Sequence, residues 1–233
     1  MFKKSFTLSK YAYKTSLNEN PWAQRLERLA AAGPQTENFS FKGYSESDIA
    51  LARKVVRNHK NKIKDYRLQN ESKPFQSVFP EDSLKKDGKF SIVYVPSTIK
   101  VESRETFDGK GKIFVWIGEG NCSQQEGMPP MFRVYEGAEI KNLFMINAPD
   151  GIHFMGSNSS ADKIVNLDVC EDAMTGKPHD PAIKNITITN SVFYHCEDKG
   201  LQVTLIRSGL KIIGNKFIRC AQPIKINKFI ESF

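Results

Sequence analysis

At residues 140–146 the chain reads IKNLFMI, an apolar run that leads into the polar pair Asp150-Gly151. Three more such runs follow, and each ends in a polar or charged cluster: 164–169 before Glu171-Asp172, 183–194 before Asp198-Lys199, and 210–218 before Arg219. Successive clusters are 22, 26 and 21 residues apart. Periods in the twenties with Asn-bearing strands predict a solenoid, and strands of this kind suit a parallel β-helix. A leucine-rich repeat is disfavoured because its Leu-x-x-Leu-x-Leu frame is absent.

Stacked coils would bring the polar clusters together. Neighbouring coils of a β-helix lie about 4.8 Å apart, so residues one period apart share a face. We therefore expect one ladder that contains the four clusters: Asp150, Glu171 with Asp172, Asp198 with Lys199, and Lys216 with Arg219. Carboxylates on adjacent rungs repel one another, and converging hard oxygen ligands are what Ca²⁺ prefers. The cations beside them suit a carboxylated ligand, which Arg can hold through two hydrogen bonds.

Each of these residues also has an ordinary interpretation when it is taken singly. Asp150-Gly151 is typical of a plain turn, and the other charges are typical of a solvated surface. Only the shared period favours a site. Nothing near His153 marks it as a base, so we expect it to be structural, and Glu126 in its polar loop is a weak candidate.

The N-terminal third differs in character. Residues 1–85 hold 16 Lys and Arg against nine Asp and Glu, which is nearly all of the net charge of +8. Pro21 and Gly33-Pro34 bracket a predicted helix over 22–32, and Ser45 with Asp48 predicts the start of a second one. A basic segment favours an anionic partner, although a solvated helix face is the commoner outcome. Aromatic residues do not alternate with the charges, so nucleic-acid binding is not expected.

Size and composition narrow the class further. The chain has 233 residues and a mean hydropathy of −0.44, and it contains no apolar window long enough for a membrane span. The four cysteines form no CxxC pair, which argues against structural zinc. Cys170, Cys196 and Cys220 recur at spacings of 26 and 24 residues, so one disulfide among them is plausible with the pairing open. The first residues lack the apolar stretch of a secretory signal.

Several motifs, in order, resemble those of class III pectate lyases, polysaccharide lyase family three. They span roughly residues 85–222 and comprise Gln124-Gln125-Glu126-Gly127, Glu136-Gly137-Ala138-Glu139, Asp150-Gly151-Ile152-His153, Asp168-Val169-Cys170-Glu171-Asp172-Ala173, Asp198-Lys199 and Lys216-Phe217-Ile218-Arg219. Asp-Val-Cys-Glu-Asp-Ala with a downstream Asp-Lys is the most specific of them. The last is similar to the family's Lys-x-x-Arg element. Two departures stand out: Asn166-Leu167 replaces aromatic residues before Glu171, and only 14 residues follow Arg219.

The resemblance implies a mainly β fold, a right-handed parallel β-helix over 86–233, preceded by a basic and mostly helical segment over 1–85. It implies Ca²⁺-dependent β-elimination of polygalacturonate, the homogalacturonan of plant cell walls. Ca²⁺ would be bound by Asp150, Glu171, Asp172 and Asp198. Lys216, Lys199, Arg219 and Glu126 would contact the substrate, and either Lys199 or Arg219 would be the base. Clustered cations would lower the pKa of Lys199 and make it the easier base.

The implied partner is acidic polysaccharide, with no nucleic acid and no membrane, and the implied location is extracellular without a recognisable classical signal. Two alternatives stay open. One is an inactive β-helix module that binds acidic polysaccharide, and the other is a secreted effector whose basic N-terminal segment does the main work. The oligomeric state is left open.

Overall fold

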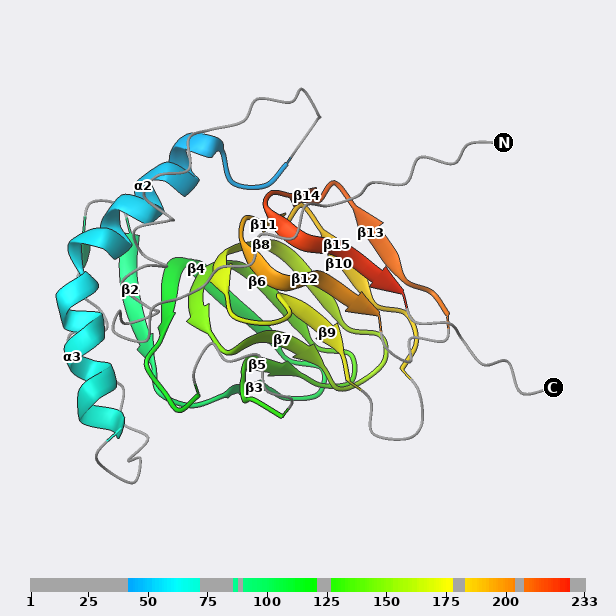
Figure 1. The fold of residues 1–233 in the computed structure, drawn as a ribbon. Helices are drawn as coiled ribbons and strands as arrows, with labels where there is room; N and C mark the ends of the chain where they lie inside the picture. Colours follow the sequence, from blue (N-terminus) through cyan, green and yellow to red (C-terminus); the bar gives the residue numbers. More distant parts are fainter. Residues whose placement is uncertain are drawn as a thin grey trace.

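The strands stack as the coils of a parallel β-solenoid of about five turns (Figure 1). This computed structural model describes residues 42–71, 86–87, 90–120, 127–177, 183–203 and 208–226. The predicted parallel β-helix is therefore confirmed, whereas its right-handed course stays a prediction. The helix expected over 22–32 and the boundary expected near residue 85 lie outside the described residues.

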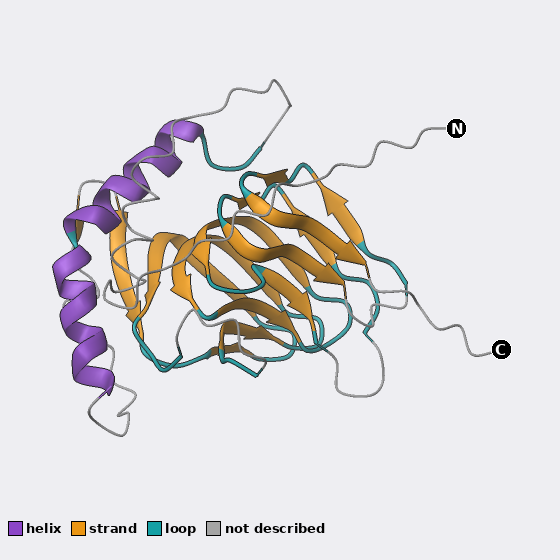
Figure 2. Ribbon diagram, viewed as in Figure 1, coloured by secondary structure: helices purple, strands orange, loops and turns teal. Residues whose placement is uncertain are grey.

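The coils form two main columns of strands (Figure 2). The first column contains β2 (Phe90–Val95), β4 (Thr106–Trp116), β6 (Glu139–Ala148) and β8 (Ser160–Val169), followed by the short pairs β10 (Thr187–Thr189) with β11 (Val192–Phe193) and β13 (Lys211–Ile213) with β14 (Lys216–Phe217). The second contains β3 (Ile99–Val101), β5 (Pro130–Val134), β7 (Asp150–Phe154), β9 (Met174–Gly176), β12 (Cys196–Val203) and β15 (Cys220–Ile226). β1 (Lys86–Asp87) pairs with β2 in the antiparallel sense.

The recurring asparagines lie at a corner of the coils. Asn142, Lys163, Asn190 and Gly214 occupy the same position on four successive coils, directly after paired residues, and all have positive φ between 49° and 65°. Gly adopts this left-handed conformation freely and Asn tolerates it better than most residues. Asn190 also donates its side-chain amide to Asp162 Oδ1 on the preceding coil, at 2.7 Å. The Asn-bearing period of the sequence is therefore the period of this turn.

Two apolar clusters stabilise the solenoid. One fills its interior, where Phe107, Phe114 and Phe132 form an aromatic group with ring centroids 5.4–5.7 Å apart. The other lies on the outer face of the first column. There, Ile92, Ile113, Phe144, Val165 and Val192 pair in register on five successive coils.

Helix α2 (Glu46–Asn58) covers this outer face, and α3 (Lys60–Glu71) follows it directly. The predicted capping box is present: the Ser45 side chain accepts the backbone N–H of Asp48, and Asp48 accepts that of Ser45. Ile49 and Val56 of α2 and Ile63 of α3 are buried against the strands. Each such side chain contributes roughly 1.5–3 kcal/mol through burial, so these helices are held by packing on the solenoid. Neither described helix is long and apolar enough to cross a membrane.

Candidate functional site

Three charged residues of the predicted ladder lie side by side on successive coils, at or near the first residues of three second-column strands. Asp150 opens β7, Asp172 precedes β9, and Lys199 lies in β12. The backbone joins them, because Gly151 N–H donates to the Asp172 carbonyl and Ala173 N–H donates to the Lys199 carbonyl, each at 2.9 Å. Their exposed fractions are only 1%, 2% and 7%. We call this set the acid–lysine ladder.

Close stacking at this point depends on glycine. A Cβ atom on Gly151 would lie 2.0 Å from the carbonyl oxygen of Ala173 on the next coil. Real Cβ atoms do not approach backbone this closely, so any larger residue would push two coils apart. The glycine that follows Asp150 therefore lets Asp150 and Asp172 lie on adjacent rungs.

Lys199 is bound by two carboxylates. Its ammonium group donates to Asp172 Oδ1 at 3.2 Å and to Asp198 Oδ2. Burial alone would lower the pKa of Lys199, but the hydrogen bond to Asp198 and the charge of Asp172 outweigh burial and raise that pKa above its ordinary value. The expectation that neighbouring cations lower this pKa is therefore wrong, because the nearest charges are acids.

Asp172 is in an unfavourable environment for a charged group. Burial and the nearby charge of Asp150 raise the pKa of Asp172, although Lys199 and a hydrogen bond from Thr175 Oγ1 at 3.1 Å act in the opposite direction. A buried carboxylate beside a second carboxylate destabilises the folded state, so stability alone does not explain this arrangement. Buried acids whose pKa is shifted by a neighbouring charge are often found at functional sites.

Asp150 is held by residues that the sequence analysis did not assign to the site. His153 Nε2 lies 2.6 Å from Asp150 Oδ2, and Lys177 Nζ lies 3.4 Å from the same oxygen. The backbone N–H of Gly151 donates to Asp150 Oδ1 at 3.1 Å. His153, expected to be structural, therefore orients a predicted site residue. The only signal in the sequence was its place in the Asp-Gly-Ile-His motif.

The remaining predicted metal ligands lie next to the ladder. Glu171 is buried and its carbonyl accepts the backbone N–H of Asp198 at 3.4 Å, while the Asp198 side chain pairs with Lys199. Asp150 and Asp172 offer hard oxygens that repel each other, a donor chemistry that fits Ca²⁺. In the arrangement of the described residues, no three His, Cys, Asp or Glu side chains converge closely enough to hold a metal ion.

Lys216 and Arg219 do not continue the ladder. Lys199 pairs with Gln222 on the last coil, whereas Lys216 pairs with Val192 and Arg219 directly precedes Cys220, the partner of Cys196. Asp198 and Arg219 are 21 residues apart, but the coil step between the cysteines is 24. Arg219 therefore falls three residues short of the ladder position, and the expectation of a single ladder is wrong for these two residues. Glu126 lies outside the described residues.

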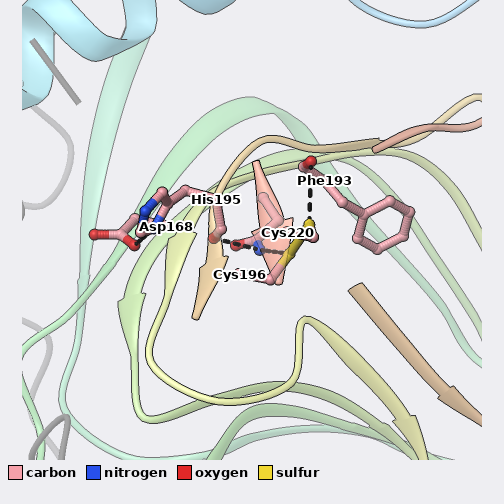
Figure 3. The surroundings of a disulfide bond; sticks show 6 residues. Asp168, Phe193, His195, Cys196 and Cys220 are labelled. Carbon is pink, nitrogen blue, oxygen red and sulfur yellow. Dashed lines mark hydrogen bonds and ion pairs between the residues drawn. A yellow bond between two sulfur atoms is a disulfide. The ribbon is translucent and has the colours of Figure 1, made fainter. Parts of the chain in front are cut away.

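A disulfide joins the last two coils beside this offset (Figure 3). Cys196 and Cys220 are bonded, with their Cα atoms 4.5 Å apart, which resolves the pairing of these two cysteines. Cys170 is also disulfide-bonded. Next to Cys196, His195 Nδ1 lies 2.8 Å from Asp168 Oδ1. Neither His195 nor Asp168 was assigned to the site from the sequence. The signal for Asp168 was its place at the start of the Asp-Val-Cys-Glu-Asp-Ala motif, and the signal for His195 was its place beside Cys196 in the cysteine-bearing period.

Comparison with known families agrees with this architecture. The model of the family described as "Pectate lyase" matches residues 84–218, which covers β1 through β14 and all three residues of the acid–lysine ladder. The match covers more than half of the chain. On the strength of this match, and of the β-solenoid that carries it, the chain belongs to the pectate lyase family.

Proposed function

We propose that this chain is a class III pectate lyase that cleaves polygalacturonate by Ca²⁺-dependent β-elimination. The observation that carries the proposal is the buried acid–lysine ladder on three successive coils of a pectate lyase family domain. It supports a polysaccharide substrate of negative charge, because Lys199 and the nearby Lys177 supply cations for substrate carboxylates.

For this reaction the protein has to position the substrate and a base, and to stabilise the negative charge that develops on the substrate. A base removes the proton at C5 of a galacturonate unit, which is acidic because it lies next to the C6 carboxylate. The C–H electrons form a C4–C5 double bond, the bond between C4 and the glycosidic oxygen breaks, and that oxygen takes up a proton. The product carries a 4,5-unsaturated end.

Asp150 and Asp172 would hold Ca²⁺, with Glu171 and Asp198 beside them. When it is bound, the ion supplies stabilisation for the negative charge that develops on the substrate carboxylate. His153 keeps the Asp150 carboxylate in place, and Thr175 does the same for Asp172. Residues that fix a ligand in this way are usually needed for affinity as well as for geometry.

Two side chains can serve as the base. Lys199 lies within the ladder, but Asp172 and Asp198 favour its protonated form, so it acts as a base only at alkaline pH. Arg219 is exposed on the last coil, and a guanidinium holds its proton still more strongly. Both assignments predict a rate that rises with pH. Lys199→Arg and Arg219→Lys separate them, because only the change at the true base shifts the pH profile.

The direct test is to incubate the purified chain with polygalacturonate at alkaline pH and to follow the ultraviolet absorbance of the unsaturated product. Absorbance that requires Ca²⁺ and stops when a chelator is added supports the proposal. Folded protein that yields no product with Ca²⁺ contradicts it.

One observation favours a second candidate, a β-helix module that binds acidic polysaccharide without cleaving it. Lys199 pairs with Asp172 of the ladder and with the adjacent Asp198, and such an ion-pair network needs no catalytic role. Ca²⁺-dependent retention on polygalacturonate without product would favour this candidate. Either activity has a substrate outside cells, and the Cys196–Cys220 disulfide suits an oxidising compartment, so we propose an extracellular place of action.

A further inference from the structure

The outer face of the second column carries a row of polar side chains that passes beside the acid–lysine ladder. Strands β3, β5, β7, β9 and β12 follow one another along the solenoid (Figure 1). In β5, Phe132 and Val134 belong to the interior cluster, so Arg133 between them points outward. The residues that continue its position in register on the other coils form, with Arg133, what we call the outer row: Lys100, Arg133, His153, Thr175, Gln202 and, on β15, Lys225.

The outer row differs from the ladder in charge. Its members are cationic or uncharged polar residues, and none of them is an acid, whereas the ladder contains Asp150 and Asp172. His153 connects the two sets. It follows Arg133 on the next coil of the outer row, and its Nε2 lies 2.6 Å from Asp150 Oδ2. A ligand bound at the ladder that continues along the solenoid therefore meets the outer row.

Two cations lie on adjacent coils at the N-terminal end of this row. Lys100 and Arg133 pair in register, which places their backbones about 4.8 Å apart. Among the residues that the structure describes, neither of them forms an ion pair with an acid. Like charges at this spacing repel each other, so stability alone does not explain the pair. A bound anion would relieve the repulsion.

Arg133 is held in place by its surroundings. Its Nε atom is buried and has no hydrogen-bond partner within the described ranges, while the residue as a whole is only partly buried. A side chain whose stem is packed loses little conformational entropy when its tip binds a ligand. The guanidinium presents a planar fork of donors that matches a carboxylate through two hydrogen bonds. Arg133 is therefore suited to hold a carboxylate at a fixed point.

We propose that Arg133, together with Lys100 on the preceding coil, binds a carboxylate of the polyuronate chain on the N-terminal side of the acid–lysine ladder. This inference rests on the proposed function and extends it, because it states on which side of the ladder the substrate continues. Arg133 determines specificity here and touches no reacting atom. It selects a galacturonate unit with a free carboxylate at this position, since a methyl ester carries no charge and cannot accept the paired hydrogen bonds.

The first test measures binding of the galacturonate hexamer to the full chain. Calorimetry is carried out with Ca²⁺ at slightly acidic pH, where the base is protonated and turnover is slow. We expect Arg133→Gln to weaken binding about tenfold, and Arg133→Lys to weaken it less, because Lys keeps the charge but loses the paired hydrogen bonds. Arg57→Gln is the matched control. Arg57 is exposed on α2, which covers the other column, so its removal should leave the affinity unchanged.

A second variant avoids the partly buried position. Lys100 is exposed, so Lys100→Glu is not expected to disturb the fold, and thermal unfolding checks this for every variant. The new carboxylate would lie on the coil next to Arg133 and compete with the substrate for it. We expect hexamer binding to weaken about fivefold. Lys64→Glu, at an exposed lysine of α3, changes the net charge equally and should have no effect.

Steady-state kinetics on polygalacturonate give a readout that a merely structural role would not move. Arg133→Gln should raise KM and leave kcat near the wild-type value, because the interaction that it removes is the same in the ground state and the transition state. Partly methyl-esterified substrate should reduce the difference between wild type and Arg133→Gln. A variant that is only less stable would show the same difference on both substrates.

The outcomes separate this inference from the proposed function. A folded Arg133→Gln that binds the hexamer as wild type does would overturn the inference and leave the proposed function standing. Equal losses in Arg133→Gln and Arg57→Gln would also overturn it, because net charge alone would then explain the effect. If Arg133→Gln does not fold, wild-type affinity in Lys100→Glu overturns it instead.

Two further results concern the wild-type protein. Hexamer that is bound, that is bound more weakly by Arg133→Gln, and that is never converted to product would support the inference and contradict the lyase reaction. Wild-type protein that does not bind the hexamer would overturn both.

Discussion

The buried pair between Lys199 and Asp172 gives a prediction that can be worked through in detail. Lys199→Met removes the ammonium group but fills most of its volume, so the loss is one of charge. Asp172 then stays buried, 2% exposed, beside Asp150 and without its cation at 3.2 Å. Breaking one partner of a buried ion pair costs about 3–5 kcal/mol. For a domain of this size we expect the melting temperature to fall by about 10 °C.

The double variant Lys199→Met with Asp172→Asn isolates the cause. Removing both charges leaves no buried carboxylate at this position, so the double variant should be more stable than Lys199→Met alone. We expect a coupling free energy of about 2 kcal/mol from the four proteins, measured by guanidinium unfolding at neutral pH. Single costs that add to within about 0.5 kcal/mol would refute the reasoning, since independent sites behave in that way.

The pH dependence provides a second check on the same pair. The pKa of Asp172 is raised in the folded protein, so the ionised side chain opposes folding at neutral pH. Protonation of Asp172 therefore stabilises the folded protein. This stabilisation is fully present below the unfolded pKa of Asp172 and is lost as pH rises through its folded pKa. Lys199→Met should raise that pKa further. Its penalty should therefore shrink on acidification, and a penalty of equal size at acidic and neutral pH would contradict the assignment.

Other parts of the structure give further predictions. Replacing both Cys196 and Cys220 by Ala opens a loop of 24 residues and should cost about 3.5 kcal/mol in the free energy of unfolding, measured under non-reducing conditions; an unchanged midpoint would count against the bond. Gly151→Ala should lower the melting temperature and the activity together, because its Cβ would meet backbone at 2.0 Å, and a folded, fully active variant would show that the coils are not so closely stacked. His153→Phe should raise the Ca²⁺ concentration needed for half-maximal activity about tenfold or more, and Lys177→Met should raise it less, since His153 is nearer to Asp150 and buried. Equal Ca²⁺ requirements in wild type and His153→Phe would remove His153 from the site.

The repeat was the part of the fold that sequence reasoning could predict well. A period in the twenties follows from the geometry of a coil, and the asparagines that mark it lie at one left-handed corner. The second helix was predictable because Ser45 and Asp48 form a local capping box. Both signals are local in sequence, and each depends on residues within one coil or one turn.

The candidate site was only partly predictable, because the coils differ in length. Asp150, Asp172 and Lys199 fall on adjacent rungs as expected, but Arg219 lies three residues short of the ladder. The sequence alone does not show how many residues each corner of a coil contains. The direction of the Lys199 pKa was missed for the same reason, since it depends on which charges end up nearest.

Contacts between coils were beyond sequence reasoning. His153 could be seen as part of a motif, but its hydrogen bond to Asp150 depends on how the strand turns after Gly151. The packing of α2 on the outer face, and with it the approach of Arg53 to Tyr194, joins segments 141 residues apart. Such pairs follow from the tertiary arrangement and leave no periodic trace in the sequence.

The central claim is that the acid–lysine ladder is the catalytic site, and the initial rate of unsaturated product formation tests it most directly. Wild type, Lys199→Met and the control Lys211→Met are compared on polygalacturonate with Ca²⁺ at alkaline pH, after each is shown to be folded. Lys211 is an exposed lysine on β13, on the outside of the last coil. The account predicts a loss of about a hundredfold or more for Lys199→Met and a near wild-type rate for Lys211→Met. A folded Lys199→Met that retains the wild-type rate would contradict it.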